Sequence, residues 1–307
     1  MMSTPLVVIV GPTGVGKTAA AVWLARTLGG EIVSADSRQV YRYMDIGTAK
    51  PTPEERAQAP HHLIDVVDPD QTLSLGEYQA MAYAAIADIA RRGRVPFLVG
   101  GTGQWVRAVV EGWTVPRVGP DPALRERLLE RAAHEGGAAL YAELRAVDPE
   151  AAARIDPRNV RRVVRALEVY ERTGQPISAQ QRRVPPPYDV LWIGLTMPRP
   201  DLYARVDARI ERMIAAGWVD EVRSLVARGY SLDLPALSAL GYREIGAYVK
   251  GELALTDAVA LIKRHTRRFI RHQYAWFGTH DPRLHWFDAR DSCLDGLWEL
   301  ARSFLRV

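Results

Sequence analysis

The sequence predicts an α/β fold in which helices flank a parallel sheet and a separate helical domain is inserted into the chain. Three observations support this. Short apolar runs alternate with helical periodicities over the first hundred residues. A glycine-rich loop follows the first apolar run and begins the first helix. Between two proline-rich breaks, the chain has helical patterns and no clear strand. Strands that alternate with helices are typical of parallel sheets with helical crossovers.

The first hundred residues supply the expected sheet in order. Strands are expected at 6–10, 31–34, 63–67 and 95–99, and helices at 17–28 and 78–92. Glycine or an acidic residue follows several of these runs, as at Gly11, Asp36 and Gly100. In parallel sheets of this kind, ligands bind beyond the carboxyl ends of the strands. The sequence therefore predicts one crevice at that edge.

The pattern changes after Gly112. Pro116, Gly119, Pro120 and Pro122 interrupt the chain, and residues 123–173 are helix formers with helical spacing. Three prolines at 185–187 close this segment, and a strand is expected again at 190–195. We therefore expect an α/β core formed by 1–112 and 190–307, with a helical insertion over 113–189. Long helices are expected at 202–228 and 257–277.

The segment 11–18 matches the phosphate-binding pattern G-x4-G-K-[ST] in full, between a predicted strand and a predicted helix. Backbone N–H groups of such a loop surround phosphate oxygens, and the helix N-terminus favours negative charge. The lysine adds a positive charge, and the last hydroxyl can reach a Mg²⁺ ion. The predicted diphosphate-binding residues of the loop are Gly11, Thr13, Gly14, Val15, Gly16, Lys17 and Thr18, with Thr18 as the magnesium ligand.

Asp36 and Thr102 are the other candidates at strand ends. Asp36, in the segment Ser-Ala-Asp-Ser-Arg-Gln, has the chemistry of a general base, although a helix cap or a magnesium-binding acid has the same pattern. Thr102 lies in Gly-Gly-Thr-Gly at 100–103, which suits close approach to a ligand and also a tight turn. The pair His61 and His62 is interpreted as structural.

A basic stripe is expected on the predicted helix 257–277. Arg264, Arg267, Arg268 and Arg271 share one face by their three- and four-residue spacing. Such a stripe is either a solvated helix face or a contact for a nucleic-acid phosphate backbone. The net charge of +4 and the pI near 9.2 also favour an anionic partner.

Composition excludes some classes. The single cysteine, Cys293, rules out a disulfide within the chain and a cysteine-based zinc site. No apolar stretch approaches the roughly 20 residues that span a bilayer, so no membrane partner is expected. With no basic leader at the N-terminus, we expect a cytoplasmic protein.

In order along the chain, several segments resemble the tRNA dimethylallyltransferase (tRNA isopentenyltransferase) family in its bacterial form. They are Gly-Pro-Thr-x-x-Gly-Lys-Thr at 11–18, Ser-x-Asp-Ser-x-Gln-Val-Tyr at 34–41, Met-Asp-Ile-Gly-Thr-Ala-Lys-Pro at 44–51, His-His-Leu-Ile-Asp at 61–65, Val-Gly-Gly-Thr-Gly at 99–103, Arg-Ala-Leu-Glu-Val at 165–169, Gly-Tyr-Arg-Glu at 241–244, and Thr-Arg-Arg-Phe…Arg-His-Gln…Trp-Phe at 266–277. The chain departs from the family pattern at Gln104-Trp105, where Leu-Tyr is usual.

The resemblance implies a fold and a reaction. The fold is a P-loop NTPase-like parallel sheet flanked by helices, with a helical insertion that contacts the tRNA anticodon stem-loop. The reaction transfers the dimethylallyl group of dimethylallyl diphosphate to N6 of the adenine on the 3′ side of the anticodon, with Mg²⁺ as cofactor. We expect the protein to act as a monomer.

The resemblance also implies residue roles. Asp36 is expected to be the general base, Lys17 and Thr102 to be catalytic, and Arg209 to bind the diphosphate. The expected tRNA contacts are Asp36, Ser37, Arg38, Gln39, Thr102, Val160, Arg161, Arg162, Val163, Val164, Arg267 and Arg268. Three alternatives stay open: an adenylate isopentenyltransferase that acts on free nucleotide, a P-loop nucleotide kinase, and a non-catalytic RNA-binding protein.

Overall fold

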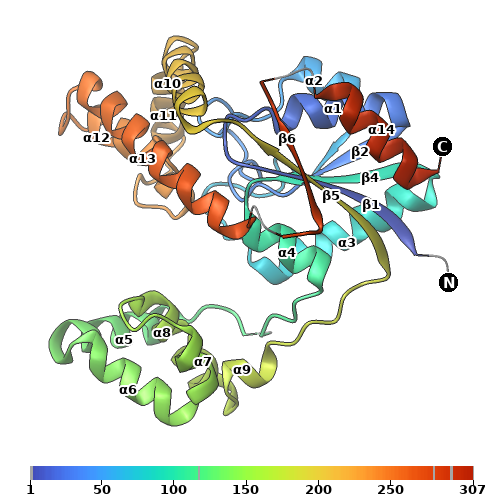
Figure 1. Cartoon of the computed structure of the whole chain (residues 1–307). Helices are drawn as coiled ribbons and strands as arrows, with labels where there is room; N and C mark the ends of the chain where they lie inside the picture. The colour runs from blue at the N-terminus through green and yellow to red at the C-terminus, as the bar shows by residue number, and fades with distance from the viewer. Residues whose placement is uncertain (1–2, 117, 279–280, 291–292, 307) are drawn as a thin grey trace. The chain divides into compact units, whose positions relative to one another are not determined.

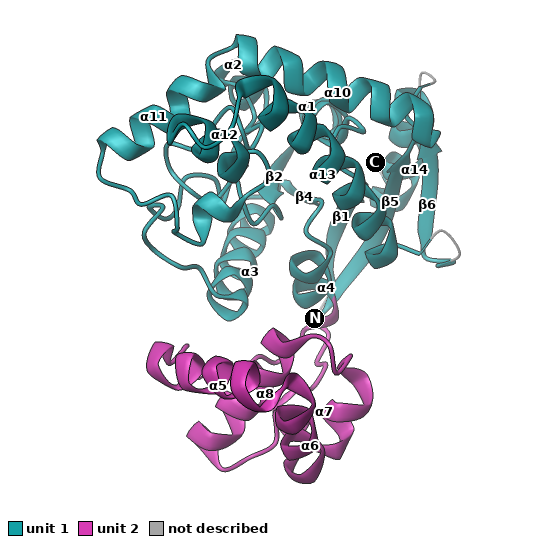
Figure 2. Ribbon diagram, turned by 90° about the vertical axis from the view of Figure 1, so that its left-hand side faces the viewer, with its two compact units in different colours: residues 1–110, 187–307 teal, residues 111–186 magenta. Residues whose placement is uncertain are grey.

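The computed structural model describes residues 3–116, 118–278, 281–290 and 293–306. The chain forms two compact units, residues 1–110 with 187–307 and residues 111–186 (Figure 2). The first unit contains the sheet and the flanking helices. Among its described residues, the second contains helices and an isolated β-bridge but no strand.

In the described part of the chain, six parallel strands form the sheet, in the order β3-β2-β4-β1-β5-β6 (Figure 1). The strands are β1 (Thr4–Val10), β2 (Gly30–Ser34), β3 (His61–His62), β4 (Val95–Gly100), β5 (Tyr188–Thr196) and β6 (Leu284–Asp288). The predicted fold class, a parallel sheet flanked by helices, is confirmed.

Helices cover both faces of the sheet. α1 (Lys17–Leu28) and α14 (Leu294–Leu305) pack against each other on one face, and α3 (Leu75–Arg91) and α4 (Gly103–Glu111) lie on the other (Figure 1). The remaining helices of this unit are α2 (Pro53–Gln58), α10 (Arg199–Ala215), α11 (Trp218–Ala227), η1 (Ala236–Ser238), α12 (Tyr242–Val249) and α13 (Leu255–Trp276).

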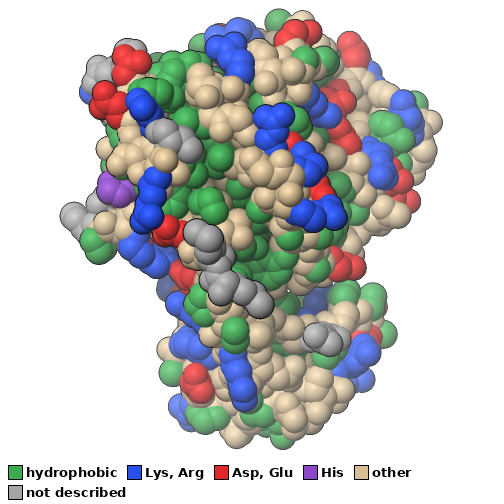
Figure 3. All heavy atoms as spheres, turned by 90° about the vertical axis from the view of Figure 1, so that its right-hand side faces the viewer, with side chains coloured by type: hydrophobic (Ala, Val, Ile, Leu, Met, Phe, Trp, Pro, Cys, Tyr) green, Lys and Arg blue, Asp and Glu red, His purple; other side chains and the backbone are tan. Residues whose placement is uncertain are grey.

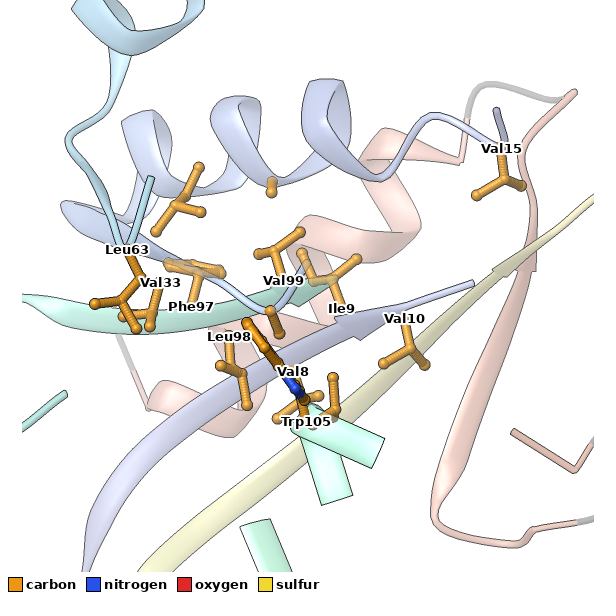
Figure 4. Close-up of a cluster of buried hydrophobic side chains, with 14 of the residues drawn as sticks. Val8, Ile9, Val10, Val15, Val33, Leu63, Phe97, Leu98, Val99 and Trp105 are labelled. Atoms are coloured by element: carbon orange, nitrogen blue, oxygen red, sulfur yellow. The ribbon is translucent and has the colours of Figure 1, made fainter. Parts of the chain in front are cut away.

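The two central strands form the core of this unit. Residues 6–10 of β1 are fully buried because helices cover both faces, so the strand is a continuous apolar run without alternation. In Figure 4, Val8 and Ile9 lie beside Leu98 and Val99 of β4, their partners in the register. Full burial of one such side chain contributes roughly 1.5–3 kcal/mol.

The helical unit has a separate core. Its helices are α5 (Pro122–Glu135), α6 (Gly137–Val147), α7 (Pro149–Arg154), α8 (Val160–Thr173) and α9 (Ile177–Gln180). Leu128, Leu140, Leu144 and Leu167 form the centre of the core and are at most 1% exposed. The apolar side chains of residues 123–173 thus recur at helical spacing because they bury a common face.

Two expected elements are wrong. Residues 63–67 are not a strand: Leu63 and Asp65 have left-handed backbones with φ of 62° and 58°, and β3 ends at His62. The expected helix at 202–228 is two helices, α10 and α11, because the chain breaks at Gly217 with φ of 98°. The sequence also gave no expectation for β6 and α14.

Candidate active site

The glycine loop between β1 and α1 lies at the carboxyl end of a central strand, as expected. Gly16 is the N-cap of α1, with a left-handed φ of 106° that strongly favours glycine. Gly14 packs closely against α10, since a Cβ there would lie 2.4 Å from Val206 Cγ2. The Lys17 ammonium donates a 2.8 Å hydrogen bond to Pro12 O. Burial lowers the pKa of Lys17 to about 8, although the Asp36 carboxylate acts in the opposite direction.

Asp36 and Thr102 lie together because two strand ends approach closely. A Cβ on Gly100 would lie 2.1 Å from Ala35 O, so only glycine allows β4 to come this near to the end of β2. The Thr102 hydroxyl accepts a hydrogen bond from Ser37 N–H at 3.1 Å, and the Asp36 carboxylate accepts one from Arg38 N–H at 2.9 Å. Asp36, Ser37 and Thr102 therefore form one cluster.

Two neighbouring cavities meet at this cluster. Their volumes are about 330 Å³ and 420 Å³, and Thr13, Lys17, Asp36, Thr48 and Arg209 line both of them. We call the first the polar cavity and the second the apolar-walled cavity.

The two cavities differ in their walls. Gly16, Thr18, Arg205 and Arg212 line the polar cavity, which suits an anion. The apolar-walled cavity is lined by Thr102 and by large apolar side chains, namely Ile210, Met213, Trp218, Phe269 and Trp276. Lys17, Asp36 and Arg209 separate an anion-binding region from a region that suits an aromatic or aliphatic group.

Arg209 reaches this boundary from α10. Burial lowers its pKa, and Asp36 acts in the opposite direction, as it does for Lys17. Arg205 and Arg212, four residues before and three residues after Arg209, also line the polar cavity. Of these three arginines only Arg209 was expected at the site, although their helical spacing indicates that all three share one face.

The three residues after Asp36 have different environments. Ser37 and Arg38 line the apolar-walled cavity, and Arg38 Nη1 also donates to Pro235 O at 3.1 Å. Gln39 is held within its own loop, because its amide donates to Ala49 O at 3.1 Å and accepts from the Ser34 hydroxyl at 3.1 Å. Gln39 therefore supports the shape of the loop.

The expected tRNA segment at 160–164 forms the first turns of α8 in the helical unit. Val163 and Val164 are only 1% and 3% exposed and belong to the core of that unit, so their side chains cannot contact a ligand in this conformation. Val160 packs against the same core, whereas Arg161 and Arg162 are exposed. The two arginines are therefore the exposed side chains of this segment.

The basic stripe of α13 is not uniform. Arg267 pairs with Asp207 of α10 and lies 5.5 Å from the ring centre of Tyr203, so it holds two helices together. Lys263 pairs with Glu211 at 2.6 Å, whereas Arg268 is exposed. On the face shown in Figure 3, blue Lys and Arg side chains likewise intermix with red Asp and Glu side chains.

Asp65, Asp68 and the two histidines that were interpreted as structural have partners within the protein. Asp65 binds Lys50 and Arg56, and Asp68 binds Arg42. His62 Nε2 contacts Glu31 Oε2 at 2.7 Å, and His61 Nδ1 contacts Ala59 O at 2.8 Å. Within the described ranges, no three His, Cys, Asp or Glu side chains gather as a metal site. Thr18, in the polar cavity, is the expected metal ligand that the structure places beside the phosphate loop.

Trp105, at the departure from the family pattern, stacks on Tyr78 with ring centres 3.8 Å apart, and the Tyr78 hydroxyl donates to Ser34 O at 3.1 Å. The larger ring is therefore accommodated by packing.

Among the helices of the described chain, none combines the length and the apolarity that crossing a bilayer requires.

A family model and curated relatives that match this chain all point to the same family. Residues 39–280 match the family model described as IPP transferase. The tRNA dimethylallyltransferase of Roseiflexus sp. (strain RS-1) is 61% identical over 273 residues, which are 89% of this chain and 90% of that protein. That of Symbiobacterium thermophilum is 55% identical over 94% of this chain and 90% of its own length.

Solved structures agree with the sequence relatives. The tRNA isopentenylpyrophosphate transferase of Bacillus halodurans has a TM-score of 0.73 and 41% identity, and the match covers 98% of this chain and 97% of that chain. A eukaryotic dimethylallyltransferase acting on tRNA has a TM-score of 0.77 and 26% identity, over 94% of this chain and 74% of that chain.

Proposed function

The chain belongs to the IPP transferase family, whose members here are tRNA dimethylallyltransferases, and from this membership we propose its reaction and the roles of its residues. It transfers the dimethylallyl group of dimethylallyl diphosphate to N6 of the adenine on the 3′ side of a tRNA anticodon and releases pyrophosphate. The observation that supports this most directly is the boundary of Lys17, Asp36 and Arg209 between the polar and apolar-walled cavities.

The diphosphate of the donor binds in the polar cavity. Backbone N–H groups of residues 11–18, together with Lys17 and Arg209, neutralise the charge that develops as the carbon–oxygen bond breaks. Arg205 and Arg212 line the same cavity and strengthen its positive potential. Pyrophosphate thereby becomes a good leaving group.

The adenine enters the apolar-walled cavity after it leaves its stack in the anticodon loop, as bases do in other base-modifying enzymes. Its N6 forms a bond to the first carbon of the dimethylallyl group while the bond from that carbon to the diphosphate oxygen breaks. Asp36 accepts the N6 proton, and Thr102 contacts the adenine. The hydrogen bond from Ser37 N–H to the Thr102 hydroxyl supports this assignment because it holds Thr102 beside the residue that follows Asp36.

Mg²⁺ fits the site with Thr18 as its protein ligand. Mg²⁺ is commonly held by one or two protein oxygens together with substrate phosphates, so the lack of an acidic cluster among the described residues agrees with this assignment. When bound, the ion would neutralise part of the charge on the diphosphate.

The tRNA contacts are proposed at both units. Ser37 and Arg38 meet the RNA beside the apolar-walled cavity, Arg268 meets a phosphate, and Arg161 and Arg162 of the helical unit meet the anticodon stem-loop. The enzyme acts as a monomer.

Prenyl transfer from dimethylallyl diphosphate to an anticodon stem-loop RNA tests this function. We expect transfer when the target adenine is present and none when another base replaces it. Preferred transfer to AMP would instead establish an adenylate isopentenyltransferase. Steady phosphoryl transfer from ATP without prenyl transfer would establish a nucleotide kinase, and RNA binding without either reaction would establish a binding protein.

A further inference from the structure

A buried amide on α13 joins two loops that each contain a proposed catalytic residue, the phosphate loop with Lys17 and the glycine loop with Thr102. Gln273 is 5% exposed and lies near the carboxyl end of this helix. Its Oε1 accepts a hydrogen bond from Thr13 N–H at 2.8 Å, and its Nε2 donates one to Gly101 O at 3.1 Å. One side chain thus binds both the phosphate loop and the glycine loop after β4.

The two partners determine which way the amide points. Thr13 N–H can only donate and Gly101 O can only accept, so the oxygen of the amide must face Thr13 and its nitrogen must face Gly101. Glutamate has the same length as glutamine. Its ionised carboxylate would accept a hydrogen bond from Thr13 N–H but would place its second oxygen against Gly101 O, where a donor is required. The site therefore requires an acceptor and a donor on the same group.

The fit between α13 and the glycine loop is close. A Cβ on Gly101 would lie 2.4 Å from Gln273 Nε2, and one on Gly103 would lie 2.4 Å from Trp276 Cβ. Gln273 and Trp276 are three residues apart, so they share a helix face. Arg107 Nη2 of α4 also donates to Trp276 O at 2.9 Å. A shift of the glycine loop relative to α13 would therefore require Gln273 to change its conformation or break its hydrogen bonds.

We infer that Gln273 is a positioning residue that sets the separation of the two loops during prenyl transfer. The phosphate loop fixes the diphosphate, while the glycine loop fixes Thr102, which accepts from Ser37 N–H beside Asp36. Gln273 thereby sets the distance between the leaving group and the base. The inference rests on the proposed function. It also gives α13 two roles, because Arg268 on the same helix is a proposed tRNA contact.

A positioning role predicts a loss in turnover with little loss in substrate affinity. Each loop can still bind its own part of the substrates, but a displacement of about 1 Å between reacting groups can cost on the order of a hundredfold in rate. A role in folding alone would instead lower the melting temperature and leave the kcat of the folded enzyme unchanged.

The test is the pH dependence of Gln273→Glu relative to wild type. When protonated, the new carboxyl can accept from Thr13 and donate to Gly101 O, as the amide does; when ionised, it cannot donate. Burial raises the pKa of such a group above its ordinary value. We expect the variant to have about a tenfold to hundredfold lower kcat than wild type at pH 8 and to approach wild type as the pH falls towards 5.5, with each KM within about twofold.

Two controls separate chemistry from folding. Gln58→Glu changes an exposed amide that also donates to a backbone carbonyl, Glu54 O at 3.3 Å, and its kcat ratio to wild type should not change with pH. Gln273→Leu should stay impaired at every pH. Gly101→Ala should lower kcat in the wild-type background and add little to Gln273→Leu, since the methyl group would displace an amide that is already absent.

The outcomes are distinct. A kcat ratio for Gln273→Glu that stays flat with pH, or a loss confined to KM, would overturn the inference, as would full additivity of Gly101→Ala and Gln273→Leu. If Gln273→Glu does not fold at pH 8, the additivity measurement decides alone. Wild-type enzyme that fails to transfer a prenyl group in the same assay would refute the proposed function instead.

Discussion

A carboxylate in the helical unit and an ammonium in the α/β unit differ in how completely the protein satisfies their hydrogen bonds. In the helical unit, Glu168 is fully buried, and its carboxylate accepts from Arg125 Nε at 2.8 Å, from Asp121 N–H at 2.7 Å and from Arg165. Beside the cavities of the α/β unit, Lys17 has one hydrogen bond, to Pro12 O, among the described contacts. A buried polar group with every bond made inside the protein stabilises the fold, whereas one with spare bonding capacity beside a cavity is ready for a ligand.

The pKa shifts follow the same division. Burial alone would raise the pKa of Glu168, but its hydrogen bonds to Arg125, Asp121 N–H and Arg165 outweigh burial, and the pKa is lowered. At Lys17, burial outweighs the Asp36 carboxylate, and the pKa falls to about 8. Interactions within the protein thus outweigh the cost of burying the charge of Glu168, but they do not outweigh it for Lys17. A diphosphate would supply the missing negative charge.

The largest expected effect is on stability, for Glu168→Ala. This change removes the common partner of two arginines and opens a cavity at a fully buried position, so we expect the free energy of unfolding to fall by about 3–5 kcal/mol. Urea unfolding of the full chain, followed by circular dichroism, measures it. Glu171→Ala on the same helix is the control: its pair with Arg127 is largely exposed, and its loss should cost less than about 1 kcal/mol. Equal losses for both variants would contradict the comparison.

The next effect is on catalysis, for Asp36→Ala. We expect turnover to fall roughly a hundredfold or more, because the proton acceptor for N6 is removed. Single-turnover prenyl transfer measures the rate, and filter binding of the stem-loop should give largely unchanged affinity. Asp36→Asn keeps an acceptor for Arg38 N–H and should lose as much activity, with a melting temperature close to that of wild type. Unchanged turnover in either variant would refute the general-base role.

A smaller effect is expected from pH. A lysine binds the diphosphate when it is charged, so kcat/KM for the donor should be constant below the lowered pKa near 8 and should fall up to tenfold per pH unit above it. Lys17→Arg should move this fall to higher pH, because arginine keeps its proton. Titration of kcat/KM from pH 6 to 10 in both proteins measures the difference. Identical profiles would show that Lys17 is not the group that titrates.

The smallest effect is on RNA affinity. Arg268 is exposed, so Arg268→Ala should weaken stem-loop binding a few-fold and reduce the salt dependence of affinity by about one unit of slope. The sequence assigned Arg267 to tRNA as well, but its pair with Asp207 predicts a loss of stability and a smaller change in slope. Binding titrations at several salt concentrations compare the two. An unaltered slope for Arg268→Ala would remove it from the interface.

The sequence predicts the parts of this protein whose pattern is local. The phosphate loop, the central strands and the helical periodicity of the insertion are readable because each depends on neighbouring residues. The break at Gly217 and the left-handed backbones at Leu63 and Asp65 depend on tertiary contacts, so periodicity extended a helix and a strand past them. Local pattern also missed β6, because this strand depends on pairing with β5, 92 residues earlier in the register that joins Trp192 to Leu284 and Thr196 to Asp288.

Site residues follow the same rule. Lys17, Asp36 and Thr102 lie at strand ends and could be found from the sequence, although their catalytic roles remain predictions. Gln273 lies in a segment that resembles the family, but its role could not be predicted, because the role depends on two loops more than 170 residues away in the chain. Val163 and Val164 show the opposite error. They lie in a segment expected to contact tRNA, but their side chains are buried in the core of the helical unit.

The helical unit begins and ends with a short paired segment. Val184 N–H donates to Gly112 O and Thr114 N–H to Arg182 O, both at 2.9 Å, around an antiparallel bridge between Trp113 and Arg183. The two ends of the insertion are therefore neighbours. If the insertion were deleted, only a short distance would separate the chain ends that have to be joined. A glycine-rich link of a few residues could span such a gap at a small cost in loop entropy. The inserted domain could therefore be deleted or replaced without any change in the strand order of the sheet.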